Sequence, residues 1–289
     1  MATLTDWLEG ARLRTLPAAV SPVLIGTGAA AGLGQASVPR ALLAAGVALA
    51  LQVGVNFAND YSDGVRGTDD VRTGPPRLTG GGKASPGAVR RAALLSLGVG
   101  AVLGVVLVAL TGSWWLLALG VLAVLAAWGY TGGRNPYGYL GLGEVGVFLF
   151  FGLMATLGTT WTQALELSWP AWAGAVGVGL IACALLMVNN IRDIPTDSQV
   201  GKNTLAVRLG DRRARWTYVG MVWAPVVLGV LCALSSPWAL LVLLLAPAAV
   251  RLSRIVLGGA VGRDLIVVLR DTGLLELGYG VLLGLGLAL

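Results

Sequence analysis

Long apolar runs with few charged residues constrain this chain more than any other feature of its sequence. Nine such runs approach or exceed the roughly 20 residues that an α-helix needs to cross about 30 Å of hydrocarbon. They cover residues 16–36, 41–59, 92–111, 113–130, 145–162, 170–190, 216–235, 237–254 and 272–288. Because 56% of the 289 residues are hydrophobic and 12% are charged, the chain has too little polar surface for a soluble globule. The sequence therefore predicts an all-α polytopic membrane protein with nine transmembrane helices in a single domain, residues 1–289.

Small residues lie throughout these runs. The chain contains 43 glycines, which are scattered through the apolar runs together with alanine. This composition is typical of close helix packing in lipid. Cys183 and Cys232 also fall within the runs, where we expect them to pack as small apolar side chains and not to form a structural disulfide.

Positive charge predicts how the chain is threaded through the bilayer. When the nine runs cross alternately, all of the 20 Lys and Arg residues except Arg40 fall on one side. They lie in the amino-terminal segment, in every second loop and, for Arg251 and Arg254, in the last turns of the eighth run, which leads into such a loop. By the positive-inside rule we expect a multi-pass protein of the cell membrane, with a cytoplasmic amino terminus and a carboxyl terminus outside. We expect the lipid bilayer, and no nucleic acid, as the partner of this basic surface.

A cleaved signal peptide is the alternative for the start of the chain, since Arg12 and Arg14 precede an apolar stretch that ends in three alanines. Pro17 and Pro22 interrupt that stretch, and removal of the first run would break the charge separation. We therefore expect the first run to be a transmembrane helix.

The stretch NFANDYSDG places Asn and Asp residues where the second apolar run ends. On a helix, Asn56, Asp60 and Asp63 are separated by four and three residues, so their side chains project from one face. Asn59 borders the same face. We expect this helix end to carry a group of oxygen ligands.

A second cluster stands at the end of the sixth run, in the stretch MVNNIRDIPTD. Asn189, Asp193 and Asp197 are spaced by four, and Pro195 is expected to stop the regular helix, so that Asp197 lies just past its end. Because the two clusters lie four helices apart and a basic loop follows each, we expect two pseudo-repeated halves, about 1–130 and 131–289, that face one cavity.

Helix capping or hydration at the membrane surface is the simplest explanation for a single Asp at such a position. Two clusters are harder to explain in that way, because the helix dipole opposes carboxylates at a carboxyl terminus and something cationic should hold them there. Mg²⁺ accepts hard oxygen ligands and shares its remaining sites with substrate phosphate. Carboxylates, Mg²⁺ and guanidinium groups together can bind a diphosphate and stabilise the charge that builds as it departs. The clusters therefore predict a Mg²⁺-dependent enzyme that ionises a lipid diphosphate within the membrane.

A cation-coupled or anion transporter is the alternative from another class, since inverted repeats with buried acids are typical of transporters as well. Two features disfavour it: the acids lie at the cytoplasmic helix ends and not at the midplane, and both clusters lead into basic loops. A CDP-alcohol phosphotransferase would need a single array of DG, AR, G and two further Asp residues at fixed spacing, which the sequence lacks.

The paired clusters resemble the Asp signatures of the UbiA superfamily of membrane prenyltransferases. The strings NDYSDGVRGTDD, GPPRLTGGG, GYLGLGEVGVFLFFG and GKNTLAVRLG, with the opening ARLRTLPAAVSPVLIG, are similar to its menaquinone-pathway branch, the 1,4-dihydroxy-2-naphthoate prenyltransferases. Ubiquinone-type members space two aspartates of the first motif four residues apart. Here Gly64 occupies the second of those places and Asp63 precedes it, which is the menaquinone-type pattern.

This resemblance implies nine helices around a central cavity, in which Mg²⁺ joins each Asp motif to the diphosphate. It assigns Asn56 to one ion with the first pair of aspartates, and Asn190 to the other ion with the second pair. The spacing of the motifs adds Asn59 and Asn189. The candidate metal ligands are therefore Asn56, Asn59, Asp60, Asp63, Asn189, Asn190, Asp193 and Asp197.

The reaction implied is transfer of a polyprenyl group from polyprenyl diphosphate to 1,4-dihydroxy-2-naphthoate. Carbon dioxide is lost, and the product is demethylmenaquinol, an intermediate of menaquinone biosynthesis. Other aromatic prenyltransferases of the superfamily, with chlorophyll, haem or homogentisate as acceptor, share the Asp motifs and remain alternatives.

Basic and aromatic residues near the clusters complete the candidate site. The candidates for diphosphate contacts are Arg66, Arg72, Arg77, Lys83, Lys202 and Arg208. Arg66 and Lys202 come first because they lie three and five residues beyond the Asp motifs, and plain positive-inside anchoring is the alternative for the others. Tyr130 and Tyr139 flank the GGRNPYG turn, where a ring face could shield an allylic cation; a place in the interfacial tyrosine belt is the alternative.

Overall fold

Every apolar run predicted from the sequence is helical over most of its length, although residues 33–36 and 113–115 lie outside the helices. The computed structural model describes residues 2–67, 77–133, 136–199 and 201–289, and these residues form helices and no strand. The α-helices are α1 (Leu4–Ala11), α2 (Leu16–Gly32), α3 (Val38–Arg66), α4 (Pro86–Thr111), α5 (Leu116–Gly129), α6 (Gly143–Val147), α7 (Ala155–Ala164), α8 (Trp169–Asp197), α9 (Leu205–Leu231), α10 (Ala246–Leu257) and α11 (Arg263–Ala288). A π-helical segment, Phe148–Met154, joins α6 to α7, and a 3₁₀ segment, Pro237–Leu245, leads into α10.

The long helices are apolar enough to cross a membrane. Among the described residues, 7 continuous helical segments have the length and hydropathy that a span requires, and the first of them combines α1 with α2. Helix α5 is also apolar but has only 14 residues, and the run expected at 272–288 lies within α11. The prediction of an all-α polytopic membrane protein is confirmed, whereas the number of nine crossings stays a prediction.

Serine and glycine mark ends of the helices α3 and α4. Ser85 precedes α4, and its hydroxyl accepts a hydrogen bond from the backbone N–H of Ala88, which satisfies one of the unpaired donors of the first turn. Gly67 ends α3 and Gly112 ends α4, both with a φ near +70° that glycine adopts without a steric penalty (73° and 68°). These residues fix where each helix gives way to a loop.

The expectation that Pro195 stops the second Asp helix was wrong. Helix α8 continues through Pro195, and Asp197 is its last residue. The φ that proline imposes is itself helical, and a proline this close to the end of a helix removes only one hydrogen bond of the ladder. Asp197 therefore stays on α8, one turn beyond Asp193.

Arg40, the exception in the charge separation, joins three helix ends. Its guanidinium donates hydrogen bonds to the carbonyls of Leu110 (3.2 Å), Thr162 (3.3 Å) and Gln163 (3.4 Å). The last carbonyls of a helix lack partners and carry partial negative charge, so a cation stabilises them. The start of α3 thus meets the ends of α4 and α7 at one end of the bundle, and the Asn/Asp clusters lie at the other.

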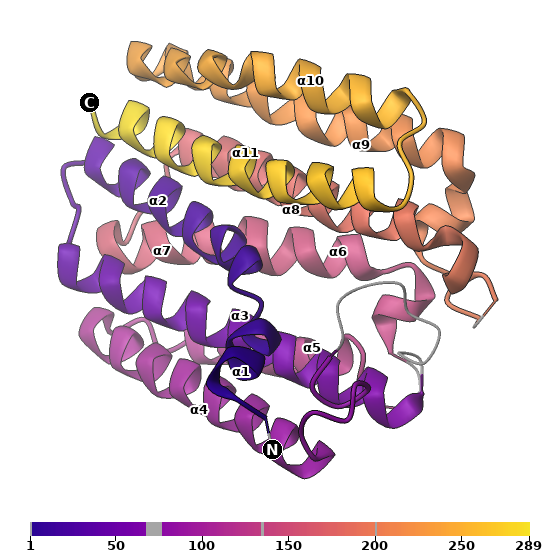
Figure 1. Cartoon of the computed structure of the whole chain (residues 1–289). Helices are drawn as coiled ribbons and strands as arrows, with labels where there is room; N and C mark the ends of the chain where they lie inside the picture. The colour runs from indigo at the N-terminus through magenta and orange to yellow at the C-terminus, as the bar shows by residue number, and fades with distance from the viewer. Residues whose placement is uncertain (1, 68–76, 134–135, 200) are drawn as a thin grey trace.

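Close glycine contacts hold α2 against α11. These helices run in the same direction side by side, and the carboxyl terminus lies beside the end of α2 (Figure 1). A Cβ atom added at Gly284 would lie 2.7 Å from the carbonyl oxygen of Leu24, and one added at Gly280 would lie 2.7 Å from the Cα of Ser21. Such an approach of two backbones is possible only where side chains are absent.

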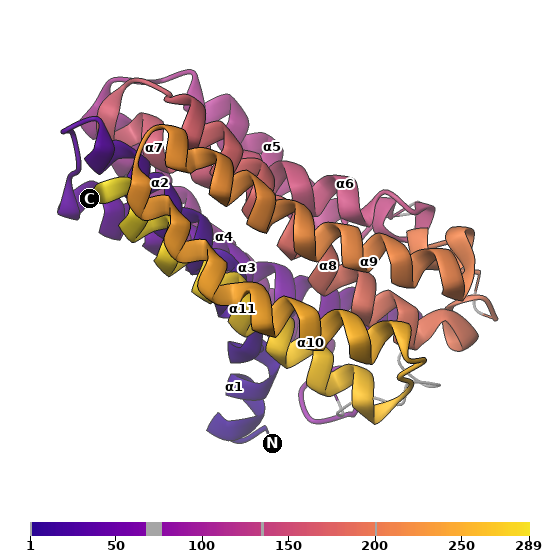
Figure 2. The ribbon, with the colours of Figure 1, turned by 90° about the horizontal axis from the view of Figure 1, so that it is seen from above.

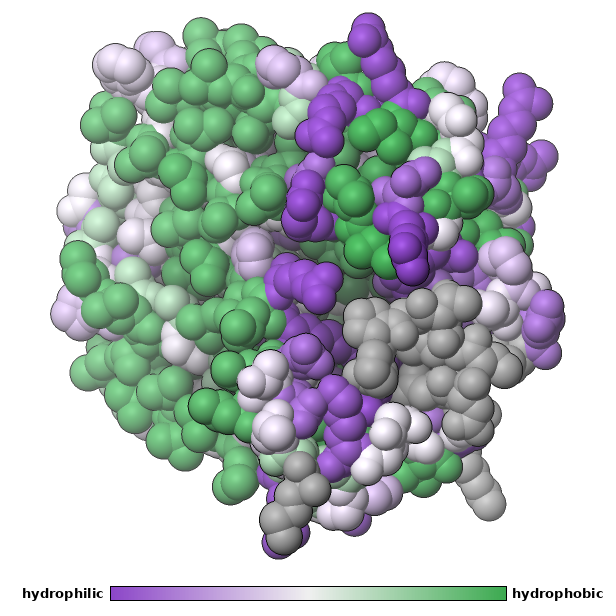
Figure 3. Space-filling view, in the orientation of Figure 1, coloured by the Kyte–Doolittle hydropathy of each residue, from purple (hydrophilic) through white to green (hydrophobic). Residues whose placement is uncertain are grey.

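Helix α8 packs against α2, α7, α9 and α11. It is the most buried of the 7 candidate spans, with 67% of its apolar stretch inside the protein. Figure 2 shows the bundle from above, with α1 projecting away from the other helices. Hydrophilic side chains gather toward one end of the bundle, around a hollow, whereas the rest of the visible face is apolar (Figure 3). The polar end is the one at which α3 and α8 finish.

The close packing of α2 against α11 predicts that two Gly→Ala substitutions affect the stability of the protein differently. We expect Gly284→Ala to destabilise the protein by about 1–3 kcal/mol, because the added methyl group would overlap the backbone of α2. Gly98→Ala meets no atom within 4 Å and should be neutral or stabilise α4 by up to about 1 kcal/mol. Thermal unfolding of both purified variants measures the difference, and equal unfolding temperatures would contradict the packing argument.

Candidate active site

A single cavity of about 1650 Å³ joins the two Asn/Asp clusters. This volume exceeds the roughly 300–1,000 Å³ of pockets for drug-sized molecules. Residues from α1 to α5, from the π-helical segment and from α7, α8 and α11 line it. The predicted site residues in its lining are Asn56, Asn59, Asp60, Asp63, Arg77, Lys83, Tyr130, Tyr139, Asn189, Asn190, Asp193, Asp197 and Lys202.

The end of α3 presents the first cluster from one helical face, as the spacing predicts. Asp60 is 1% exposed, and its two oxygens accept hydrogen bonds from the backbone N–H groups of Leu78 (3.0 Å) and Thr79 (2.9 Å). Asp63 lies one turn further and forms an ion pair with Arg77 at 2.8 Å. Asp60 thus holds the segment that carries Arg77 against α3.

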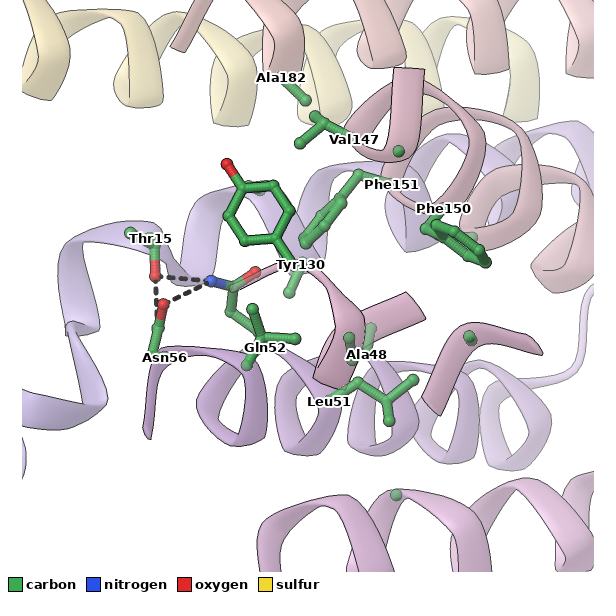
Figure 4. Close-up of a pocket in the computed structure, with 18 of the residues that line it drawn as sticks. Thr15, Ala48, Leu51, Gln52, Asn56, Tyr130, Val147, Phe150, Phe151 and Ala182 are labelled. Carbon is green, nitrogen blue, oxygen red and sulfur yellow. Dashed lines mark hydrogen bonds between the residues drawn. The ribbon is translucent and has the colours of Figure 1, made fainter. Parts of the chain in front are cut away.

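The amide groups of the first cluster are bound to neighbouring helices. Asn56 donates to the carbonyl of Ala11 and to the hydroxyl of Thr15, both at 2.9 Å, and accepts a bond from Gln52 (3.3 Å). Figure 4 shows Thr15, Gln52 and Asn56 pointing toward one another beside the ring of Tyr130. This network ties α3 to the turn between α1 and α2, so the position of Asn56 in the cavity wall is fixed.

The second cluster contains its own cation. Arg192 contacts both carboxylate oxygens of Asp193 at 2.7 Å, and it donates to the amide oxygen of Asn189 at 2.9 Å. Asp197 follows at the end of α8, also in the cavity wall. The guanidinium of Arg192 therefore pairs with Asp193 within the cavity wall.

Tyr139 joins the first cluster to Lys202. Its hydroxyl donates to Asp63 at 2.7 Å, and the ammonium nitrogen of Lys202 lies 4.5 Å from the centre of its ring. A cation over an aromatic face at this distance is stabilised by the ring. Tyr139 therefore brings Lys202, which follows α8, close to Asp63 at the end of α3.

Glu144 was missed by the sequence analysis. It is the second residue of α6, it is 5% exposed, and its carboxylate accepts a hydrogen bond from Asn190 at 3.1 Å. Its only signal in the sequence is that it is the sole charged residue in the apolar stretch GYLGLGEVGVFLFFG. Arg12 and Arg14 also line the cavity and were not among the predicted contacts.

Three of the predicted diphosphate contacts have other partners in the structure. Arg66 donates to the carbonyls of Thr131 and Gly133, and Arg208 donates to the carbonyls of Asn203 and Leu140; neither arginine is in the cavity lining. Lys83 lies in the lining but is paired with Asp6 at 2.5 Å. Arg72 lies outside the described residues.

Two groups outside the spans have shifted pKa values. The hydrogen bond with Asp6 raises the pKa of Lys83, so Lys83 stays a cation at the cavity mouth. Burial raises the pKa of Tyr137 to about 12, and its hydroxyl therefore stays protonated at physiological pH.

The donor set of the cavity fits Mg²⁺. Carboxylate and amide oxygens are its preferred protein ligands, and Mg²⁺ typically leaves several positions to water or phosphate. Within the described part of the chain, no three Asp, Glu, His or Cys side chains gather as a ready-made cage. Acids on two facing helix ends, with Arg77, Arg192 and Lys202 beside them, suit an ion that is shared with an anionic ligand.

Comparisons with known proteins agree with this architecture. The sequence pattern of the UbiA prenyltransferase family matches residues 19–259. The chain is 53% identical over 274 residues to the 1,4-dihydroxy-2-naphthoate octaprenyltransferase of Mycobacterium tuberculosis, covering 95% of this chain and 94% of the relative. It is 39% identical over 260 residues to the Escherichia coli protein of the same name, covering 87% of this chain and 84% of the relative.

Solved structures show the same fold at low sequence identity. A UbiA homologue from Aeropyrum pernix in its apo form superposes with a TM-score of 0.70 at 17% identity, covering 93% of this chain and 96% of the other. A UbiA homologue from Archaeoglobus fulgidus, bound to DMAPP and Mg²⁺, gives 0.65 at 15% identity, covering 95% and 97%. The family pattern covers most of the sequence, and the relatives match nearly end to end. The chain therefore belongs to the UbiA prenyltransferase family.

Proposed function

We propose that this protein transfers a polyprenyl group from polyprenyl diphosphate to 1,4-dihydroxy-2-naphthoate and releases carbon dioxide, giving demethylmenaquinol for menaquinone biosynthesis. The observation that carries the proposal is the single cavity into which α3 and α8 both present Asn/Asp clusters with basic partners. The names of the relatives at 53% and 39% identity support the choice of acceptor. Membership of a prenyltransferase family disfavours the transporter alternative.

Mg²⁺ would be held at each of the two clusters, with one ion in each. The first would bind it through Asp60, Asp63 and the amides of Asn56 and Asn59, and the second through Asp193, Asp197 and the amides of Asn189 and Asn190. The ion supplies Lewis-acid stabilisation of the departing diphosphate. The presence of Mg²⁺ in the Archaeoglobus fulgidus homologue supports this assignment.

The cavity cations bind and orient the diphosphate in this proposal. Arg77 and Arg192 pair with the acids at 2.8 and 2.7 Å, and Lys202 lies against Tyr139. An anion that enters between the clusters together with Mg²⁺ can replace the acids as partner of these cations, and charge-assisted contacts of this kind are about twice as strong as neutral hydrogen bonds. Arg66 and Arg208 instead position the turn after α5 through backbone carbonyls.

Aromatic and apolar side chains receive the organic part of the donor. Tyr130, Phe150 and Phe151 stand around the cavity beyond the polar end, with Leu51 and Ala48 on α3 opposite them (Figure 4). The face of Tyr130 can stabilise an allylic cation once diphosphate leaves, whereas the ring of Tyr139 already lies against Lys202 and Arg66. Low polarity also excludes water, which would otherwise capture the cation.

The acceptor needs little help from a base. The electron-rich ring attacks the allylic carbon through the ring carbon that bears the carboxylate. That carbon carries no hydrogen, so the ring recovers aromaticity by losing carbon dioxide. The chain contains no histidine, which is consistent with chemistry that does not depend on a strong protein base.

The orientation in the membrane is part of the proposal. We place the clusters and the amino terminus on the cytoplasmic side of the cell membrane and the carboxyl terminus outside, with 1–130 and 131–289 as related halves. Helices α2 and α11 run in the same direction, which supports a first and a last span that cross the membrane in the same direction. Labelling of a cysteine introduced at Gly81 by an impermeant reagent added to intact cells would contradict this orientation, because the loop before α4 should be protected.

Coupling between prenylation and decarboxylation tests the reaction. We expect carboxyl-labelled 1,4-dihydroxy-2-naphthoate to release labelled carbon dioxide in equal amount to the demethylmenaquinol formed, and only when a prenyl diphosphate is present. Scintillation counting of trapped gas and mass spectrometry of the lipid extract measure the two products. A prenylated product that keeps the label, or a preference for homogentisate or 4-hydroxybenzoate, would assign the protein to another branch of the family.

A further inference from the structure

Glu144 is a buried acid for which the reaction described above has no use. It lies in the first turn of α6, where the helix dipole favours a negative charge. Its backbone carbonyl accepts a hydrogen bond from the thiol of Cys183 on α8 at 3.2 Å. Helix α6 is thereby held against α8, and the carboxylate of Glu144 has a fixed place beside the second cluster.

The partner of that carboxylate is Asn190. Its amide nitrogen donates to Oε1 of Glu144 at 3.1 Å, and the two residues are 8% and 5% exposed. An amide has one donor side and one acceptor side, so a bond made by the nitrogen fixes the direction in which the oxygen points. Asn190 also lines the cavity.

We propose that Glu144 is a positioning residue, which holds Asn190 so that its amide oxygen faces the cavity and serves the ion of the second cluster. The inference rests on the proposed function, because it assigns that ion to the cluster. Without Glu144 the amide could rotate and turn its NH₂ group toward the cation, and an NH₂ group repels a cation. Outer partners that orient metal ligands in this way typically change metal affinity about 10- to 100-fold when they are replaced.

The local backbone supports a positioning role. A Cβ atom added at Gly143 would lie 3.2 Å from Leu186 of α8 and 3.4 Å from the hydroxyl of Tyr130, so α6 packs closely where Glu144 projects. The π-helical segment Phe148–Met154 begins directly after α6, and such segments occur frequently at functional sites.

Binding of Mn²⁺ in the presence of inorganic diphosphate tests the proposal on the purified full chain. Free Mn²⁺ is measured by electron paramagnetic resonance, and thermal unfolding is recorded for each variant. We expect Glu144→Leu, which leaves the amide nitrogen of Asn190 without its acceptor, to weaken Mn²⁺ binding about 10- to 100-fold. Glu166→Leu makes the same chemical change at an exposed position outside the cavity lining and should bind as the parent does.

Glu144→Gln keeps a side-chain oxygen that can accept from Asn190, so it should hold the amide oxygen toward the cavity and bind Mn²⁺ within a few-fold of the parent. This rescue by the conservative variant separates positioning from a general requirement for a carboxylate.

The outcomes are distinct. Parent protein that binds no Mn²⁺ with diphosphate would contradict the proposed function. Parent binding with an unchanged Glu144→Leu variant, or a Glu144→Gln variant that binds as weakly as Glu144→Leu, would overturn the positioning role alone. A Glu144→Leu variant that does not fold would also overturn the proposal, because the pair would then be a requirement for folding.

Discussion

Carboxylates at the carboxyl ends of apolar helices create the electrostatic constraint on which this site depends. The helix dipole already places partial negative charge at the ends of α3 and α8, so acids there require cations. Arg77 and Arg192 meet this requirement at 2.8 Å from Asp63 and 2.7 Å from Asp193. A divalent ion and an anionic ligand can take up the same charges. The polar end of the cavity is thus suited to exchange between internal ion pairs and a bound metal diphosphate.

The rest of the fold keeps those two helix ends facing one another. The glycine contacts at Gly280 and Gly284 bring α11 onto α2, and Arg40 fixes the opposite end of α3 to the ends of α4 and α7. Between these fixed ends, the cavity passes from the polar clusters into an apolar region lined by residues such as Phe150 and Phe151. One continuous space can therefore accept a charged head and an apolar chain, which explains why the reaction belongs within a membrane.

The parts of this architecture that depend on local sequence were predictable. Long apolar runs predict membrane-spanning helices. The four- and three-residue spacing of Asn56, Asp60 and Asp63 places their side chains on one face of the helix. Contacts across the fold were not predictable from spacing. Arg66 is close to the Asp motif in sequence but donates to carbonyls after α5, whereas Arg77, much further along the chain, reaches Asp63. Glu144 has no pattern around it, and only packing against α8 reveals its bond to Asn190.

The central claim is that the two clusters serve one reaction centre, and a double-mutant cycle tests it most directly. The values of kcat/KM for prenyl diphosphate are measured for Asp63→Asn, Asp193→Asn, the double variant, and the exposed control Asp264→Asn. The account predicts that each single variant loses at least about 100-fold and that the double variant loses little more, because groups that act as a unit are not additive. A single variant with the rate of the parent, or losses that simply multiply, would contradict it.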